Sequence, residues 1–344
     1  MAEIFGRNWT RRELLARVGH MDQLAGIRAS TAGDGTARGG RLFDVTTGSG
    51  LSFRVLADRA LDITSCSYRG TPLAWNSPSG EVHPSYYEAA GMGWLRSFPG
   101  GLVTTCGLDQ FGAPSFDAGE DFGIHGRLSN LPAEQVSHRA EWRGDEYQLE
   151  IRGRVRQARL FGENLVLERC ITTRLGSNRI LLEDTVCNEG FEPQPHMLLY
   201  HCNLGFPLVS EETRLAFEAE TTLPRDADAE PGLAAWHRFQ APTTGYREQV
   251  FRHVAKADEK GMVAVTVHNP GLEFDLVIRY PKAALPHLFQ WKMMGQGAYV
   301  LGIEPANSSG IGGRAAARES GDLPQLEPGE SRKYQLLFDI VERR

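Results

Sequence analysis

Residues 165–187 read LVLERCITTRLGSNRILLEDTVC and carry the clearest strand pattern in the chain. Apolar and polar side chains alternate along residues 165–173 and again along residues 179–187, and many of them are β-branched. Gly176 and Asn178 lie between the two runs, where a turn is expected. An alternation with a period of two, interrupted by turn residues, is typical of antiparallel β-strands.

The same pattern recurs along most of the chain. No long segment with a helical period follows the first twenty residues, and the 38 Gly and 18 Pro favour many turns. We therefore predict an all-β fold, a large antiparallel β-sandwich. The further predicted strands are residues 41–46, 51–56, 147–154, 262–269, 274–280 and 334–341.

One short helix is expected, near the N-terminus. Thr10 and Glu13 have the spacing of a capping box, and a short apolar stripe follows them and ends at Gly19. Residues 1–20 are thus expected to form a helical appendage. No linker of low complexity divides the chain, so residues 1–344 are expected to form a single sandwich domain.

Composition excludes several classes of protein. The 37 Lys and Arg against 43 Asp and Glu give a net charge of -6, which argues against a nucleic-acid partner. No apolar run is long enough to span a membrane, and the first residues lack the apolar stretch of a secretory signal. The five cysteines include no CxxC pair and suggest reduced thiols. We expect a cytoplasmic protein with no membrane partner.

Motifs for common cofactors are absent. The chain has no GxGxxG after a strand, no GxxxxGK[ST], no HExxH and no GxSxG. His196 and His201 are spaced so that neither a strand nor a helix puts both rings on one face, which argues against a histidine pair on a metal. We therefore expect no cofactor and no metal ion.

Two histidines lie in contexts that fix the shape of the backbone. His125 lies in GIHGR, between two glycines that would let the backbone approach a ligand closely. His201 lies in YHCN, where alternation along a strand places it on the same face as Asn203. Each histidine has a structural alternative, His125 as a surface-loop residue and His201 as a hydrogen-bonded core residue.

A carboxyl group stands at the end of another predicted strand. In LGIEP, Glu304 is followed by Pro305, which ends the hydrogen-bonding ladder. Apolar neighbours raise the pKa of a carboxyl group, which suits a general base that works near neutral pH. The alternative is an ordinary glutamate at a strand end.

The segment QWKMM supplies candidate sugar contacts. Trp291 is expected on one face of a strand, with Gln290 and Lys292 on the other. An aromatic ring can stack on the apolar face of a sugar while amide and ammonium groups bind its hydroxyls. Trp291 can equally belong to the core. The aromatic and glycine-rich segment 76–131, which lacks a clean strand pattern, is interpreted as the wall of a binding site.

Two arginines are candidates for binding an anionic group. Arg127 follows His125, and Arg59 lies in DRALDI. Arginine binds carboxylates through two parallel hydrogen bonds, so a sugar or a sugar acid is the expected small-molecule substrate. In the alternative, Arg59 forms a structural ion pair with Asp62 and Lys292 binds only hydroxyls.

HGR, YHCN and GIEP, in that order, resemble motifs of the galactose mutarotase-like superfamily, the aldose 1-epimerases. A fuller set of segments is similar to the DUF4432 branch of that superfamily, and together they cover nearly the whole chain. These segments are FGRNWTRRELLARVGHMDQLAGIR, VLADRALDI, FPGGLVTTCGLDQFG, IHGRLSNLPAE, HMLLYHCNLGFPL and LGIEPAN.

The resemblance implies a β-supersandwich and a cofactor-free isomerase that interconverts the α and β anomers of an aldose. By this resemblance, Glu304 takes the proton of the anomeric hydroxyl, His201 protonates the ring oxygen, and His125 holds or polarises that oxygen. Two alternatives stay open: another sugar epimerase or lyase reaction with the same acid and base, and a non-catalytic sugar-binding module. The motifs also leave open which sugar is bound, which carbon is epimerised and whether the chain forms a homodimer.

Overall fold

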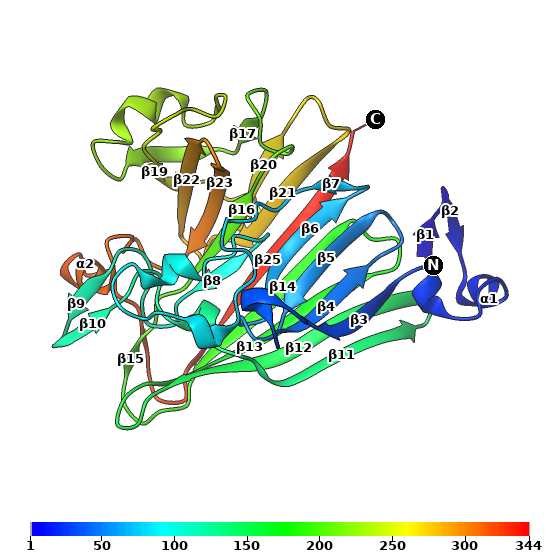
Figure 1. Cartoon of the computed structure of the whole chain (residues 1–344), viewed down its shortest axis with the longest axis horizontal. Coiled ribbons are helices and arrows are strands. Elements are labelled where there is room, and N and C mark those ends of the chain that lie inside the picture. Colours follow the sequence, from blue (N-terminus) through cyan, green and yellow to red (C-terminus); the bar gives the residue numbers. More distant parts are fainter. Residues whose placement is uncertain (1, 344) are drawn as a thin grey trace.

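Antiparallel sheets make up nearly all of the regular structure in the computed structural model, which describes residues 2–343 (Figure 1). The predicted all-β class with few, short helices is confirmed. The two runs within residues 165–187 form neighbouring strands of the largest sheet. That sheet has the order β11 (Glu134–Arg143), β12 (Glu146–Ala158), β13 (Asn164–Arg174), β14 (Arg179–Asn188), β25 (Ser331–Glu342), β21 (Phe274–Pro281), β20 (Met262–His268) and β17 (Arg214–Ala216).

Two smaller sheets complete the main body. The six-stranded sheet has the order β18 (Ala219–Pro224), β19 (Gln249–Ala255), β22 (His287–Gly295), β23 (Ala298–Ala306), β16 (Leu199–Leu204) and β8 (Thr104–Cys106). The five-stranded sheet consists of β3 (Gly26–Thr31), β4 (Arg41–Thr46), β5 (Leu51–Leu56), β6 (Asp62–Tyr68) and β7 (Thr71–Pro72). Three strand pairs lie outside these sheets: β1 (Ala2–Ile4) with β2 (Arg7–Trp9), β9 (Ser115–Asp117) with β10 (Glu120–Phe122), and β15 (Gln194–Pro195) with β24 (Gln325–Leu326).

A continuous apolar core joins the three main sheets. Val55 of β5, Leu167 of β13 and Leu301 of β23 are all fully buried in it. Along strands such as β14, the alternation sends one set of side chains into this core and leaves the other set nearer the surface, whereas β16 and most of β23 are buried on both faces. A smaller cluster, which includes Trp94 and Phe289, packs beneath one end of the six-stranded sheet.

The N-terminal region is only partly helical. Thr10 caps α1 (Arg11–Leu15) through the predicted capping box with Glu13. The helix is a single short segment, because only Leu14 of the apolar stripe is buried, and the β1–β2 pair precedes it. A helical appendage over residues 1–20 was thus too broad a prediction. The other helices are α2 (Arg314–Glu319) and the 3₁₀ helices η1 (Met21–Gln23), η2 (Gly35–Ala37), η3 (Pro84–Tyr86), η4 (Gly93–Arg96), η5 (Leu128–Asn130) and η6 (Glu230–Ala235).

A buried ionic network connects the sheets behind β16. Arg169 is fully buried and donates to Asp184 from Nε and Nη2, at 2.9 and 2.7 Å. Its Nη1 lies 2.7 Å from Asp62. Tyr200, which precedes His201, donates its hydroxyl proton to Asp184 at 2.7 Å. Asp62 therefore pairs with Arg169, and the alternative of an Arg59–Asp62 ion pair was wrong.

Neither a disulfide nor a membrane-spanning helix is found in residues 2–343. All five cysteines are free thiols. No helix of the described chain has the length and apolar character needed to cross a bilayer.

Candidate active site

Strand register brings His201 and Glu304 together. In the β16–β23 ladder, Leu199 pairs with Ala306 and Cys202 with Ile303, so His201 and Glu304 lie across from each other between these pairs. Nε2 of the histidine is 3.3 Å from Oε1 of the glutamate, and both side chains are almost completely buried.

Gly302 leaves room for the glutamate side chain. A Cβ atom at this position would lie 2.5 Å from Oε1 of Glu304 and 2.9 Å from Cβ of Trp291. Both distances are shorter than real Cβ contacts allow. The carboxyl group therefore occupies space on the sheet surface that any larger residue would fill.

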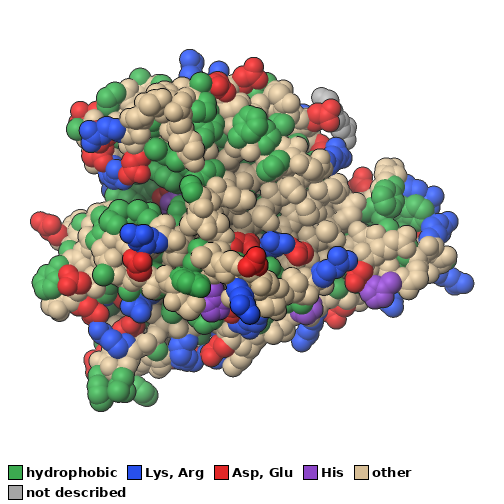
Figure 2. All heavy atoms as spheres, viewed as in Figure 1, with side chains coloured by type: hydrophobic (Ala, Val, Ile, Leu, Met, Phe, Trp, Pro, Cys, Tyr) green, Lys and Arg blue, Asp and Glu red, His purple; other side chains and the backbone are tan. Residues whose placement is uncertain are grey.

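The pair lies in a cavity of about 430 Å³. Figure 2 shows a hollow beside the six-stranded sheet, rimmed by hydrophobic side chains. Nine of the seventeen lining residues come from the segment 76–131, which the sequence identified as a binding-site wall. The lining comprises Met92, Trp94, Leu95, Phe98, Gly112, Ala113, Pro114, Ile124, His125, His201, Arg225, Glu248, Val250, Trp291, Glu304, Ile311 and Gly312.

His125 enters the same cavity from a tight loop. Its φ of 59° lies in the left-handed region, and its ring centroid is 5.5 Å from that of His201. The neighbouring Gly126 has a φ of 72°, and a Cβ there would meet the carbonyl oxygen of Gln110 at 2.3 Å. The glycine is thus needed for backbone packing, and both Gly123 and Gly126 line a neighbouring cavity.

Burial keeps the reactive groups neutral. It raises the pKa of Glu304 to about 8, with a smaller contribution in the same direction from Glu248. It lowers the pKa of His201 well below its ordinary value, and the nearby His125 adds to this effect. Burial also lowers the pKa of His125 to about 4. Near neutral pH the site therefore contains a protonated carboxyl group and two neutral imidazoles.

Three polar atoms of the site have unused hydrogen-bonding capacity. Nδ1 of His201, Oε1 of Glu304 and Oδ1 of Asn203 are buried and have no hydrogen-bond partner within the protein. Asn203 lies on the same face of β16 as His201 and donates from its amide to the carbonyl oxygen of that residue at 2.8 Å. Such groups are costly to bury unless a ligand or water satisfies them. His201 and Glu304 line the cavity, where their free atoms are suited to a ligand rich in hydroxyl groups, whereas Asn203 is buried next to His201 and does not line it.

The cavity rim contains two charged residues that the sequence analysis missed. Glu248 accepts hydrogen bonds from Nη2 of Arg225 at 3.0 Å and from the indole nitrogen of Trp291 at 2.8 Å. The β18–β19 pairing places Arg225 next to Val250, to which its backbone N–H donates. Neither residue lies in a recognisable motif, so only the strand pairing could have revealed them.

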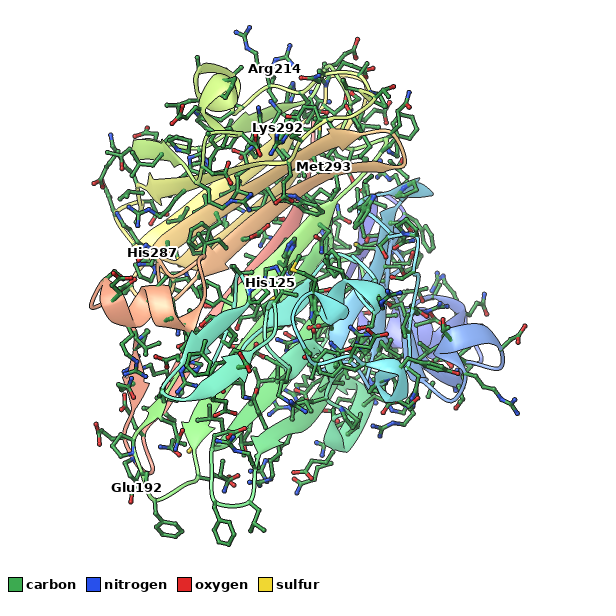
Figure 3. All side chains as sticks on the ribbon, turned by 60° about the vertical axis from the view of Figure 1, so that its left-hand side comes forward. His125, Glu192, Arg214, His287, Lys292 and Met293 are labelled. Atoms are coloured by element: carbon green, nitrogen blue, oxygen red, sulfur yellow. The ribbon has the colours of Figure 1, made fainter. Side chains whose placement is uncertain are left out.

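Gln290 and Lys292 do not line the cavity, although the predicted alternation along β22 is correct. Gln290 accepts a hydrogen bond from His253 and donates one to the carbonyl oxygen of Trp236. Lys292 donates to the carbonyl oxygen of Ala235 at 3.3 Å. The cavity lies on the Trp291 face, so the alternation itself turns both polar residues away from it. In Figure 3, Lys292 lies well apart from His125.

Arg59 and Arg127 are also absent from this cavity. Arg59 is buried behind the wall, where it donates to the carbonyl oxygens of Ser129 and Val82, and burial lowers its pKa to about 10. Arg127 is exposed, and its guanidinium lies 5.9 Å from the ring centre of Tyr87. It lines a different cavity, because the turn at His125 and Gly126 points adjacent side chains to opposite sides of the loop.

No group of three or more His, Cys, Asp or Glu side chains within residues 2–343 is arranged to hold a metal ion. The ionisable groups that meet in the cavity are instead a carboxyl group and two imidazoles, with an arginine and a glutamate at the rim. These groups can donate, accept and transfer protons.

The family model described as "Domain of unknown function (DUF4432)" matches residues 37–340. No functionally curated protein matches the sequence.

Several crystal structures have the same fold. A "putative aldose 1-epimerase" from Klebsiella pneumoniae subsp. pneumoniae MGH 78578 superposes with a TM-score of 0.88 at 26% identity, over 94% of this chain and 86% of that one. A galactose mutarotase-like protein from Clostridium acetobutylicum superposes with a TM-score of 0.65 at 13% identity, over 93% of this chain and 99% of that one. Galactose 1-epimerase from Lactobacillus acidophilus NCFM superposes with a TM-score of 0.59 at 13% identity, over 93% of this chain and 100% of that one. The mutarotase-like fold predicted from the sequence is thereby confirmed.

Proposed function

Because the chain belongs to the DUF4432 family and has a galactose mutarotase-like fold, we propose that it is an aldose 1-epimerase, an isomerase that interconverts sugar anomers. The observation that carries this proposal is the contact between Glu304 and His201 inside a cavity, with hydrogen-bonding capacity left on both side chains. Mutarotation needs one group that accepts the proton of the anomeric hydroxyl and another that donates a proton to the ring oxygen, the two oxygens that are bonded to C1 of the sugar.

The proton count of the pair fits this reaction. With a protonated Glu304 and a neutral His201, the pair holds one acidic proton that can pass from the carboxyl group to the imidazole. Transfer of that proton from the carboxyl group to the imidazole gives a carboxylate that can accept and an imidazolium that can donate. Sugar hydroxyls in the cavity would favour this charged form, because hydrogen bonds to ionised groups are the stronger ones. The carboxylate then takes the proton of the anomeric hydroxyl.

Ring opening follows from transfer of the second proton. As the anomeric C–O–H loses its proton to Glu304, a C=O bond forms at C1, the bond from C1 to the ring oxygen breaks, and His201 protonates that oxygen. Rotation about the C1–C2 bond and the reverse transfers close the ring as the other anomer. Both residues end in their starting protonation states, so the reaction needs no cofactor.

Other cavity residues position the sugar in this proposal. His125, kept neutral by burial, hydrogen-bonds the ring oxygen, while Trp291 stacks on an apolar face of the sugar. Asn203 contributes its unpaired amide oxygen to a hydroxyl or to the His201 ring. Arg225 and Glu248 neutralise each other at the rim. We therefore propose a neutral aldose as substrate.

Saturation-transfer NMR with a panel of free aldoses tests the function. Only a mutarotase exchanges the signals of the α and β anomers without forming a net product, so exchange above the spontaneous rate with at least one neutral aldose is expected. A new sugar would instead indicate epimerisation at another carbon or a lyase reaction. Binding of aldoses without any exchange would indicate a sugar-binding module.

A further inference from the structure

A second, larger cavity lies beside the candidate active site. Its volume is about 720 Å³. The β9–β10 hairpin, the end of β12 and the loop that contains Arg127 form its walls. The mechanism proposed above uses none of its residues, and Pro114 is the one described residue that lines both cavities.

Three segments form the partition between the two cavities: residues 89–95, 112–116 and 123–127. Each segment contributes some residues to one cavity and some to the other. In the last of them, His125 lines the active-site cavity and Arg127 lines the second one. Backbone hydrogen bonds join the three segments. The second cavity is thus a separate compartment with a wall in common with the first.

Most charged residues of the second cavity are already paired. The pairs are Asp109 with Arg314, Glu120 and Glu163 with Arg159, and Arg156 with Glu189. Burial also raises the pKa of Asp109 and of Glu163, which reduces the negative charge that they present. Within residues 2–343, Arg127 and Asp121 are the two charged lining residues that form no ion pair.

Arg127 has the features of an anion contact. It is exposed, and its one recorded interaction is with the ring of Tyr87, at 5.9 Å. The guanidinium therefore keeps its donors free for a carboxylate or phosphate. The cavity also contains aromatic surface, because Phe116 on the hairpin is 64% exposed, while the ring of Phe122 packs against the guanidinium of Arg314 at 4.4 Å.

We propose that the second cavity binds a sugar that carries an anionic group, with Arg127 contacting the anion and the aromatic hairpin contacting the sugar ring. The distribution of charges fits this division: the neutral aldose occupies the first cavity, where Arg225 and Glu248 pair with each other, and the anionic ligand occupies the cavity that Arg127 lines. This site does not depend on the proposed reaction, since no residue of the Glu304–His201 pair contributes to it.

Calorimetric titration with glucose 6-phosphate and with glucuronate tests the proposal, with glucose as the neutral comparison. At least one anionic probe should bind with an affinity that depends on Arg127, whereas glucose, which is expected in the first cavity, should bind independently of Arg127. The two anionic probes distinguish a phosphate from a carboxylate ligand. Arg127→Gln should weaken binding of that probe about tenfold or more, as expected for loss of a charge-assisted contact. Arg127→Lys should restore part of the affinity, and higher salt should weaken binding in the wild type.

Three further variants locate the binding. Glu304→Gln, which alters the first cavity, should leave the affinity for the anionic probe unchanged. Asp121→Asn should not weaken it, because it removes a like charge. Arg139→Gln removes an exposed arginine outside the cavity and serves as the matched control. No binding of either anionic probe, an unchanged affinity in Arg127→Gln or a lost one in Glu304→Gln would overturn the proposal. Absence of mutarotation would leave these results unaffected.

Discussion

Glu304 is the residue on which the account depends most, and its environment predicts an unusual effect on stability. Its pKa is about 8 in the folded protein and close to 4.5 in the unfolded chain. Below pH 4.5 both states hold the proton. Between pH 4.5 and 8 only the folded state keeps it, so the stability that this group contributes falls as the pH rises through that interval.

Glu304→Gln should therefore stabilise the protein at pH 8, by about 2 kcal/mol or more, because the variant has no carboxyl proton to lose. Urea unfolding of wild type and variant at several pH values between 5 and 9 measures the difference, which should grow with pH. The exposed Glu259→Gln serves as the control and should follow the wild type. A constant difference between Glu304→Gln and wild type at all pH values would contradict the raised pKa.

The sequence predicted the ionisable residues of the cavity more accurately than it predicted the residues that surround them. His125, His201, Asn203 and Glu304 lie in motifs whose turn or strand context is local, and the structure brings all four together. Arg59 and Lys292 were placed at the site because of their charge and hydrogen-bonding chemistry, without any pattern that shows where their side chains point. Which face of a strand meets a cavity depends on the packing of the whole sheet, and the sequence does not contain that information in any local pattern.

At the level of elements, β23 positions the carboxyl group by means of Gly302. Gly302→Ala should lower turnover at least about tenfold, because the added methyl group would lie 2.5 Å from Oε1 of Glu304 and displace it. Steady-state mutarotation rates and the circular-dichroism spectrum of the variant provide the measurement. The strand itself should stay intact, since Gly302 has no positive φ.

Gly295→Ala on the neighbouring β22 is the matched control for this prediction. A Cβ there meets the mobile end of the Met293 side chain at 2.7 Å, which can move away. The Gly295→Ala variant should therefore retain nearly full mutarotation activity. An active Gly302→Ala variant would show that the position of the carboxyl group is not critical.

The buried network behind β16 is the second element-scale feature. Asp184→Ala removes the partner of both Arg169 and Tyr200 and leaves a buried arginine with one carboxylate in place of two. Removing one partner of a buried ion pair typically costs about 3–5 kcal/mol, so a loss of this size in the free energy of unfolding is expected. Denaturant unfolding measures it.

The control for the network is an exposed pair. Arg143 and Glu141 form an ion pair at 3.0 Å with side chains that are 53% and 45% exposed. Glu141→Ala should change stability by less than about 1 kcal/mol. Similar small losses in both variants would mean that the buried network contributes little to the fold.

The arrangement of the elements was predictable only in part. Alternation along residues 165–187 predicts strands and their pairing across a short turn, and the Thr10–Glu13 spacing predicts the helix cap. β22 and β23 form a local hairpin, but the position of β16 beside β23 depends on pairing between residues about 100 positions apart, which no local pattern specifies. The family resemblance supplied the architecture that periodicity alone could not.

At the scale of the whole molecule, the continuous core predicts that the chain behaves as one domain. Buried residues from each of the five-, six- and eight-stranded sheets belong to one large cluster, so no sheet is expected to remain folded without the others. Limited proteolysis should therefore yield no stable fragment that consists of one sheet. Accumulation of such a fragment, folded by circular dichroism, would argue for two or more domains.

The measurement that tests the central claim most directly is a double-mutant cycle on the anomer exchange rate. In buffer with EDTA, Glu304→Gln and His201→Asn should each lower the rate by about two orders of magnitude or more, and the double variant should be little slower than either single one. Groups that act as a unit are strongly non-additive. Near-wild-type exchange in a single variant, or losses that simply multiply in the double variant, would contradict a shared acid–base pair.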